Sequence, residues 1–175
     1  VAAINATALR ALSTGQIGAL TSTQVQALNA SQMGALTSDQ LNAINTTAFA
    51  KLSSAQVAAI NNASMAGLST DQLANLTTAQ IKGITGAQIA RFSTDNIKAL
   101  SSDQVKALVA SQLQSMAFDQ LNALDTEDLA AIETAQIVAL KADQISRLST
   151  SQLDALTTAQ ARALLAGQVS SLTTE

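Results

Sequence analysis

Large apolar residues recur at every eighth position along this chain, and no insertion or deletion interrupts the spacing. A second apolar column lies three residues before the first; it runs from Val1 and Leu9 through Ile17 to Val169, with Ala161 as its one small member. Two columns without a polar exception indicate a continuous aliphatic core. The first column, called the leucine column below, comprises Ile4, Leu12, Leu20, Leu28, Leu36, Ile44, Leu52, Ile60, Leu68, Leu76, Ile84, Phe92, Leu100, Leu108, Met116, Leu124, Ile132, Leu140, Leu148, Leu156, Leu164 and Leu172.

The eight-residue period argues against one long helix and against a β-solenoid. Successive helical residues are rotated by about 100°, so each unit would turn the apolar stripe by about 80° and the stripe would face no single partner. Ala, Gln and Asn, which fill many of the intervening positions, are poor strand formers, and strict alternation of apolar and polar residues is missing.

The polar positions of the unit predict a short helix with its own N-terminal cap. The consensus is L-[ST]-[ST]-x-Q-[ILV]-x-A. With Ser13 as N-cap, Gln16 takes the N3 position, and the two form a capping box. Leu12 at N′ and Ile17 at N4 then form the hydrophobic staple that accompanies such a box. Each unit is therefore predicted to hold one helix that ends at the next leucine-column residue.

Helices this short are not stable alone, because isolated helices below about 12–15 residues are marginal in water. The predicted fold is therefore an all-α solenoid, a superhelix of short capped helices with one helix per eight-residue repeat. The leucine column and the Ile/Val column lie inside, and Ser, Thr and Asn lie outside. We expect residues 1–175 to form a single repeat array of about 22 octads. A start at Val1 and an end within a unit at Glu175 suggest a fragment of a longer array.

The few charges follow the direction expected for helix dipoles. Charged residues make up 12% of the chain and the net charge is −3. Negative charge is favoured in the first turn of a helix and positive charge in the last turn. The charges at the N2 position are all acidic, namely Asp39, Asp71, Asp95, Asp103, Asp119, Glu127 and Asp143. The position two residues before the leucine column carries the basic residues Arg10, Lys82, Lys98, Lys106 and Arg162.

The pattern weakens between Val109 and Asp125. Val109, Ala117, Lys141 and Leu165 stand in the N-cap column but lack a side-chain oxygen that could cap a helix. In residues 108–120, where Phe118 also replaces a usual Ser or Thr, we predict that two units merge into one longer helix. Neutral drift in a redundant array explains these changes, and a bend or a contact point is the alternative.

The residue before each leucine-column residue is usually Ala, but Lys51, Arg91 and Arg147 stand at this position. We predict that this column is partly exposed, so that long side chains reach solvent. Gly83 and Asn75 in the same column suggest a position that favours small or flexible residues.

The composition excludes most catalytic chemistry. Without His or Cys the chain lacks the commonest general base, metal ligand and thiol nucleophile. We expect no enzymatic activity, no catalytic, cofactor-binding or metal-binding residues and no cofactor. The chain has no basic run for nucleic acid and no apolar run long enough for membrane insertion.

Two groups of polar residues have a second interpretation. Asp119, Asp125, Glu127 and Asp128 form the chain's acidic cluster, for which a solvated face is favoured over a weak Ca²⁺ site. The recurring Gln could line a ligand-binding groove, but its capping role already accounts for it.

Units such as Leu68-Ser-Thr-Asp-Gln-Leu73, Leu76-Thr-Thr-Ala-Gln-Ile81 and Leu156-Thr-Thr-Ala-Gln160 resemble the tandem L-[ST]-T-x-Q-[IV]-x-A arrays of very large bacterial surface or secreted proteins, which are described as adhesin-like. The resemblance covers the whole chain. It implies an extracellular or cell-surface location and a structural stalk or spacer that presents other domains. The uncapped units near Val109 and Ala117 depart from the repeat.

Two other functions remain open from the sequence. Superhelical arrays offer extended grooves, so a binding module for peptide or glycan is one alternative. A self-assembling, fibre-forming repeat is the other, because an array without terminal caps exposes apolar end faces. The partners would then be other copies of the chain or neighbouring domains of the same polypeptide, and the pattern identifies no specific partner.

Overall fold

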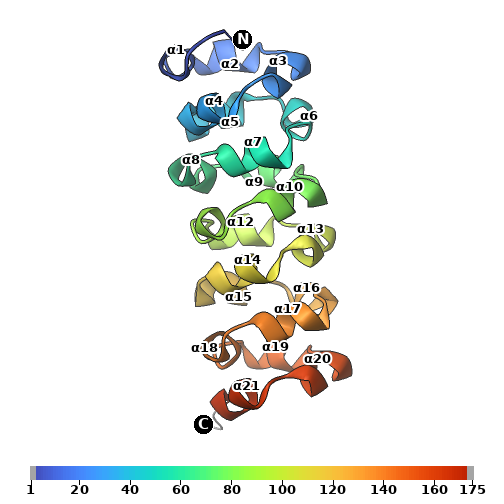
Figure 1. Cartoon of the computed structure of the whole chain (residues 1–175). Helices are drawn as coiled ribbons and strands as arrows, with labels where there is room; N and C mark the ends of the chain where they lie inside the picture. The colour runs from blue at the N-terminus through green and yellow to red at the C-terminus, as the bar shows by residue number, and fades with distance from the viewer. Residues whose placement is uncertain (1–2, 173–175) are drawn as a thin grey trace.

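The computed structural model describes residues 3–172, in which all regular structure is helical. The short helices stack into an elongated superhelix with the chain ends at opposite ends of the stack (Figure 1). This confirms the predicted all-α solenoid. Val1 of the second apolar column and Thr173 of the N-cap column lie outside the described residues.

One helix occupies each eight-residue unit, as predicted. The helices are α1 Ala6–Arg10, α2 Thr14–Gly18, α3 Ser22–Gln26, α4 Ala30–Ala35, α5 Ser38–Ala43, α6 Thr46–Phe49, α7 Ser54–Ala59, α8 Asn62–Ala66, α9 Thr70–Ala74, α10 Thr78–Gly83, α11 Gly86–Ile89, α12 Thr94–Lys98, α13 Ser102–Ala107, α14 Ala110–Ser115, α15 Phe118–Asn122, α16 Thr126–Ala131, α17 Thr134–Ala139, α18 Ala142–Ile145, α19 Thr150–Asp154, α20 Thr158–Ala163 and α21 Ala166–Ser171.

Most of the described helices begin with the predicted local hydrogen bonds. In α2, the backbone N–H of Gln16 donates to Ser13 Oγ at 3.2 Å, and the backbone N–H of Ser13 donates to Gln16 Oε1 at 2.9 Å. The same reciprocal capping box starts α3, α5, α7 and α10, among others. The end of α2 is closed by a bond from Leu20 N–H to the Ile17 carbonyl at 3.1 Å.

The chain changes direction between helices with extended residues alone. After α4, Leu36 has φ −65° and ψ 139°, and Thr37 has φ −80° and ψ 165°. No residue in the described range has a positive φ, and none follows a cis peptide bond. The connection between successive helices therefore requires neither Gly nor Pro, which is consistent with a chain that contains 7 Gly and no Pro.

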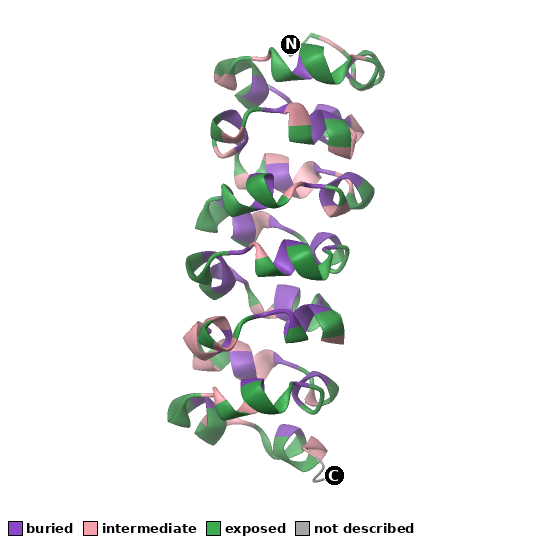
Figure 2. Cartoon of the chain, turned by 180° about the vertical axis from the view of Figure 1, so that it is seen from behind, coloured by how far each residue is buried: buried purple, intermediate pink, exposed green. Residues whose placement is uncertain are grey.

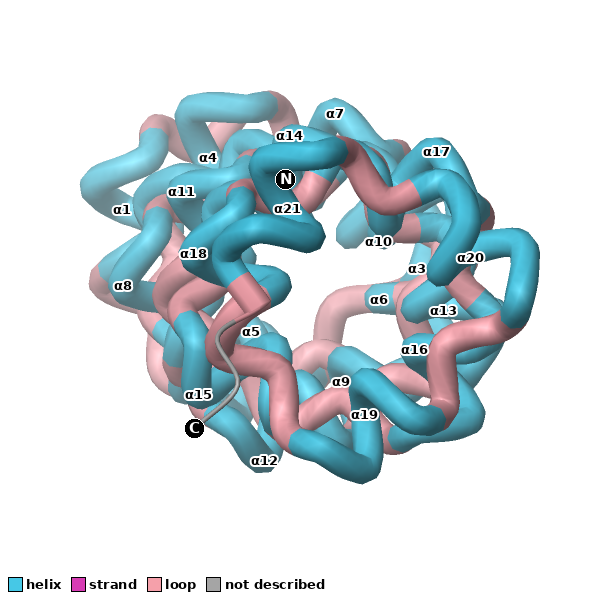
Figure 3. Tube along the Cα trace, turned by 90° about the horizontal axis from the view of Figure 1, so that it is seen from below, coloured by secondary structure: helices cyan, strands magenta, loops and turns pink. Residues whose placement is uncertain are grey.

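Helices three apart in the sequence pack against each other in successive turns of the superhelix. α1 contacts α4, α4 contacts α7, and α7 contacts α10. Side-chain hydrogen bonds join residues 28 apart, for example Gln80 and Leu52. Since 28 residues hold three and a half octads, each superhelical turn consists of about three and a half units. Figure 3 shows this arrangement along the superhelix axis.

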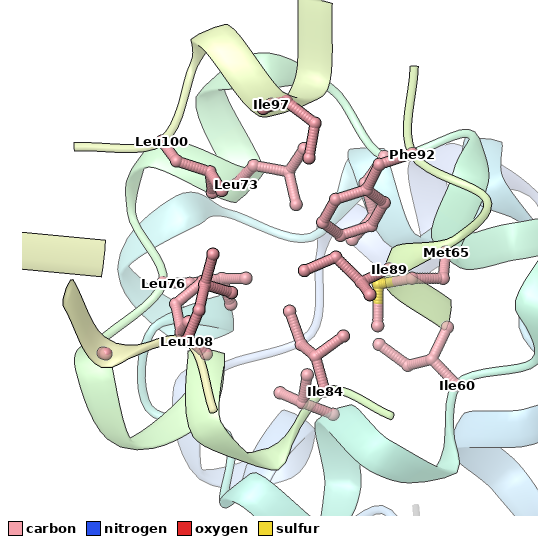
Figure 4. Close-up of a cluster of buried hydrophobic side chains, with 14 of the residues drawn as sticks. Ile60, Met65, Leu73, Leu76, Ile84, Ile89, Phe92, Ile97, Leu100 and Leu108 are labelled. Carbon is pink, nitrogen blue, oxygen red and sulfur yellow. The ribbon is translucent and has the colours of Figure 1, made fainter. Parts of the chain in front are cut away.

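The core is the pair of apolar columns, as predicted. Both columns are buried through the central turns, and the buried residues face the interior and the interfaces between turns (Figure 2). The side chains interdigitate across turns in one continuous cluster (Figure 4). The residues labelled there are Ile60, Met65, Leu73, Leu76, Ile84, Ile89, Phe92, Ile97, Leu100 and Leu108.

The predicted merging of two units within residues 108–120 is wrong. α14 ends at Ser115 and α15 begins at Phe118, and the intervening Met116 and Ala117 are both extended. Met116 is buried in the core, which holds it in the N′ position. The backbone N–H of Ala117 still donates to Gln120 Oε1 at 2.7 Å. Half of the capping box thus survives without a capping side chain at residue 117.

Phe118 makes a contact between turns instead of extending a helix. Its ring lies beneath the guanidinium group of Arg147, with 4.3 Å from Arg147 Cζ to the ring centroid. Residues 29 apart meet in the same way elsewhere: a Cβ added to Gly83 would lie 2.7 Å from Ser54 Cβ. The column before each leucine therefore packs against the N1 column of the previous turn, which explains its preference for small residues.

The predicted placement of charges is confirmed. Lys51, Arg91 and Arg147 are exposed. Acidic residues lie in the first turn of α5, α9, α12, α13, α15, α16 and α18, and basic residues lie in the last turn of α1, α10, α12, α13 and α20. None of the described helices is long and apolar enough to span a membrane.

Candidate functional site

The recurring glutamine of the N3 position connects each turn of the superhelix to the turn before it. Its side-chain amide nitrogen donates to backbone carbonyl oxygens 28 to 31 residues earlier. We call this set of bonds the glutamine ladder. Its members are Gln32, Gln40, Gln56, Gln72, Gln80, Gln88, Gln104, Gln112, Gln120, Gln136, Gln144, Gln152, Gln160 and Gln168.

Gln80 shows the complete set of bonds and is 1% exposed. Its backbone N–H donates to Thr77 Oγ1 at 3.2 Å, and its Oε1 accepts from the Thr77 N–H at 2.8 Å. Its Nε2 donates to the carbonyl oxygens of Phe49 at 3.1 Å and Leu52 at 2.8 Å. One buried side chain thus caps the start of its own helix and the end of a helix one turn away.

The ladder meets a physical requirement of stacked short helices. The last carbonyl groups of a helix have no partner within that helix, and a buried carbonyl without a hydrogen bond is costly. After α6 the Phe49 carbonyl accepts from the Leu52 N–H at 3.0 Å, but among the described residues no backbone N–H donates to the carbonyl of the buried Leu52, which is the group that Gln80 reaches. Each ladder bond contributes about 0.5–1.5 kcal/mol net, and its loss would leave a desolvated carbonyl behind.

The sequence pattern predicted the capping-box hydrogen bonds of the Gln column. It did not predict the hydrogen bonds from the Gln amide nitrogen to the preceding turn. A signal was present, because a capping box accepts Glu as readily as Gln, yet the N3 column contains no Glu. Only Gln carries both the oxygen that the cap requires and an amide N–H that can reach a second helix. The structure therefore supports a structural role for the Gln column over a ligand-binding one.

Two departures from Gln preserve the contact between turns by other means. Ser64 Oγ donates to the Leu36 carbonyl at 2.7 Å, and the N-cap residue Asn61 donates from Nδ2 to the Gly34 carbonyl at 2.9 Å. Asn96 Nδ2 donates to the Leu68 carbonyl at 3.2 Å. The carbonyl acceptors 28 residues earlier are thus satisfied although neither side chain is as long as Gln.

The side-chain oxygen of Gln72 does not accept the capping-box hydrogen bond from the N-cap residue of its helix. The backbone N–H of Ser69, which would donate to Gln72 Oε1, donates instead to Asn42 Oδ1 at 2.9 Å. Gln72 Oε1 is the one buried side-chain polar atom without a hydrogen-bond partner among residues 3–172. Its Nε2 still donates to the carbonyls of Leu41 and Ile44. The bonds between turns are retained, and of the capping box the bond from the Gln72 N–H to Ser69 Oγ remains, at 3.2 Å.

Ala48 and Asp128 interrupt the ladder, because neither side chain carries an N–H that could reach a carbonyl. Asp128 is half-buried and lines a cavity of about 710 Å³ together with Leu100, Asp125 and Gln152. By the 28-residue register, the Leu100 carbonyl is the group that a glutamine at position 128 would reach. The cavity thus lies where the ladder is interrupted.

The acidic cluster is not gathered into one site. Asp119 lies in α15, while Asp125, Glu127 and Asp128 lie at the start of α16. Within the described range no three carboxylate-bearing residues are close enough to hold a metal ion. Asp125 and Glu127 are exposed, as a solvated face requires.

The aromatic side chains offer no platform for a ligand. Phe49 and Phe92 are buried in the core, and Phe118 is half-buried beneath Arg147. These are the three aromatic residues of the chain, which has no Trp or Tyr. Exposed aromatic columns, on which extended binding surfaces often depend, are therefore missing.

The chain matches one protein-family model several times in tandem. The model describes the ALTTAQ repeat, and it matches residues 1–30, 33–70, 49–86, 57–94 and 121–158, which together cover more than half of the chain. These overlapping matches agree with the eight-residue period and with the uniform helical units. No curated protein matches this chain.

Proposed function

Because the chain belongs to the ALTTAQ repeat family, we propose that it is a structural stalk or spacer segment of a large bacterial surface or secreted, adhesin-like protein. The observation that supports this role most directly is the glutamine ladder. It bonds almost every turn to the preceding one and runs through the length of the stack. A column of such bonds holds an elongated shape in a way that apolar contacts alone do not, because hydrogen bonds are directional.

The surface suits a spacer better than a binding module. The outward positions are mostly Ser, Thr, Asn and Gln, with scattered charges and no exposed aromatic column. The hydroxyl groups of the N-cap column already accept helix N–H donors, as Thr77 does. We therefore also propose that the segment has no enzymatic activity of its own and acts outside the cell.

Small-angle X-ray scattering of arrays with half, once and twice this number of octads would test the spacer role, with data extrapolated to infinite dilution. A rigid rod predicts a radius of gyration that grows in proportion to the number of octads. A compact domain would follow roughly the 0.38 power of chain length and an unfolded chain roughly the 0.6 power. Either of those exponents would contradict the proposal.

The location requires a separate test on the full-length protein. Protease digestion and membrane-impermeant labelling of intact cells should modify the exposed Lys51 and Lys98 if the array lies outside the cell. A cytosolic protein of known location serves as the unlabelled control. Labelling that appears only after lysis would contradict a surface location, and secretion would be recognised by the array in the medium.

A further inference from the structure

Four acidic residues of the N2 column fall on one line along the superhelix. A turn contains three and a half octads, so a residue position returns to the same side of the stack after steps that alternate between three and four octads. The four residues follow these steps, at intervals of 32, 24 and 32 residues. All four are exposed. We call this set the acidic line, and its members are Asp39, Asp71, Asp95 and Glu127.

Basic residues form a second line by the same steps. Lys82 and Lys106 are 24 residues apart, and Arg162 follows after 56 residues, which is two turns. Lys51 lies 31 residues before Lys82, within one residue of the four-octad step. All four side chains are exposed. We call these four residues the basic line.

The two lines lie on different sides of the stack. The acidic line runs through α5, α9, α12 and α16, and the basic line runs through α10, α13 and α20 and the residue after the C-cap of α6. Viewed along the axis, α9 and α12 lie at the lower edge of the ring, whereas α10, α13 and α20 lie at its right (Figure 3). None of the eight charges forms an ion pair within residues 3–172, so all are accessible to a neighbouring molecule.

One charge of opposite sign lies near each line. Lys98 belongs to the same helix as Asp95 of the acidic line. Glu133 lines a surface pocket together with Lys82 and Lys106 of the basic line. A single opposite charge leaves a net charge of four residues against one, so each line keeps its sign.

We propose that arrays associate side by side, with the acidic line of one copy against the basic line of a second copy of this chain. Both lines repeat with the turns of the same superhelix, so opposite charges can meet at matching heights along the stack. An exposed ion pair contributes little by itself, and the contact therefore depends on several pairs acting together.

The contact joins unlike surfaces on different sides of the molecule, so each copy can meet a different neighbour on each line and a row can grow laterally. It uses the sides of the superhelix, which a longer array continues in both directions. The association goes beyond the spacer role of a single chain, because it gives neighbouring stalks a contact with one another.

Sedimentation velocity over a series of concentrations tests the association at two salt concentrations. In about 0.01 M salt charges act over about 30 Å, and in about 1 M salt over about 3 Å. The average mass should rise with concentration in low salt and stay at the monomer value of 17.9 kDa in high salt. A chain that stays monomeric in low salt would overturn the proposal. So would association that is equally strong in high salt.

The double variant Lys106→Glu/Arg162→Glu leaves the basic line without net charge. We expect its self-association in low salt to be at least about ten-fold weaker than that of the wild type. The matched control Arg10→Glu/Arg91→Glu makes the same change in net charge at exposed residues outside both lines. It should associate like the wild type. Equal weakening by both variants would show that net charge, and not the basic line, governs association.

Mixing two variants tests whether the lines bind each other. Asp71→Lys/Glu127→Lys leaves the acidic line without net charge, and alone it should associate as weakly as Lys106→Glu/Arg162→Glu. An equimolar mixture of these two variants should form pairs, because one protein retains its basic line and the other its acidic line. Circular dichroism should show the same helix content for all the proteins. A mixture that associates no more than its separate components would contradict the proposal.

Discussion

Helices α10 and α16 occupy equivalent positions in their eight-residue units but are held by different bonds. α10 has the full polar set, with Thr77 as N-cap and Gln80 in the glutamine ladder. α16 begins at Asp125, whose side chain makes no cap hydrogen bond, and has Asp128 in the ladder position. Their second-column residues Ile81 and Leu129 are nevertheless both 0% exposed.

This comparison separates the two sets of interactions that form the array. The apolar columns place a unit in the stack even where its own polar side chains do not contribute. α16 keeps its position without a side-chain cap and without a ladder donor of its own, while its carbonyls accept from Gln160. The polar bonds add to the contact between neighbouring turns, because Gln80 bonds two carbonyls of the preceding turn and Asp128 has no N–H to supply. The effects of mutations should therefore rank in that order.

The largest effect is expected from truncation in the core, and it should be similar in the two regions. Ile81→Ala and Leu129→Ala each remove a fully buried aliphatic side chain. We expect each to lower the free energy of unfolding by about 2–5 kcal/mol. Urea denaturation followed by circular dichroism measures this. A Leu129→Ala cost far below that of Ile81→Ala would show that the unit with the interrupted ladder is also loosely packed.

A smaller effect, opposite in sign at the two sites, is expected from exchanging the ladder residues. Asp128→Gln supplies an amide for the Leu100 carbonyl and an oxygen for the Asp125 N–H, so it should stabilise the array by about 1 kcal/mol. Gln80→Asp removes the bonds to Phe49 and Leu52 and should destabilise it by about 1–3 kcal/mol. Urea denaturation again gives both values.

Glu127→Gln is the matched control for Asp128→Gln, since it removes the same charge from an exposed neighbour. It should not stabilise the array, because the negative charge at the start of α16 is favoured by the helix dipole. Equal stabilisation by both substitutions would mean that relief of charge repulsion, and not repair of the ladder, is the cause.

The smallest effect is expected from the N-caps. Thr77→Ala should destabilise the array by about 0.5–2 kcal/mol, and Ala117→Ser should stabilise it by an amount in the lower part of that range. Thermal unfolding measures both. Thr78→Ala, which changes the adjacent exposed threonine at N1, is the control and should have little effect. An Ala117→Ser variant no more stable than the wild type would show that the surviving bond from the Ala117 N–H to Gln120 is sufficient.

Much of the local structure followed from the eight-residue pattern. The positions of the caps, the staple and the two apolar columns predicted one helix per unit and the identity of the core, as in α2 with Ser13, Gln16 and Ile17. The prediction failed at Ala117, where the missing cap suggested a merged helix. Burial of Met116 and the hydrogen bond from the Ala117 N–H to Gln120 Oε1 keep the two helices separate there.

The sequence by itself determined where most of the helices begin and end, because capping and stapling act between residues three to five apart. Only the tertiary structure decided which units meet. Three and a half units per turn is a result of side-chain packing around the superhelix axis, and that number sets the 28-residue spacing. It brings Gln80 to Leu52, and a nearly equal spacing of 29 residues brings Arg147 to Phe118. The second role of the glutamine column depends on this spacing, which no property of a single octad specifies.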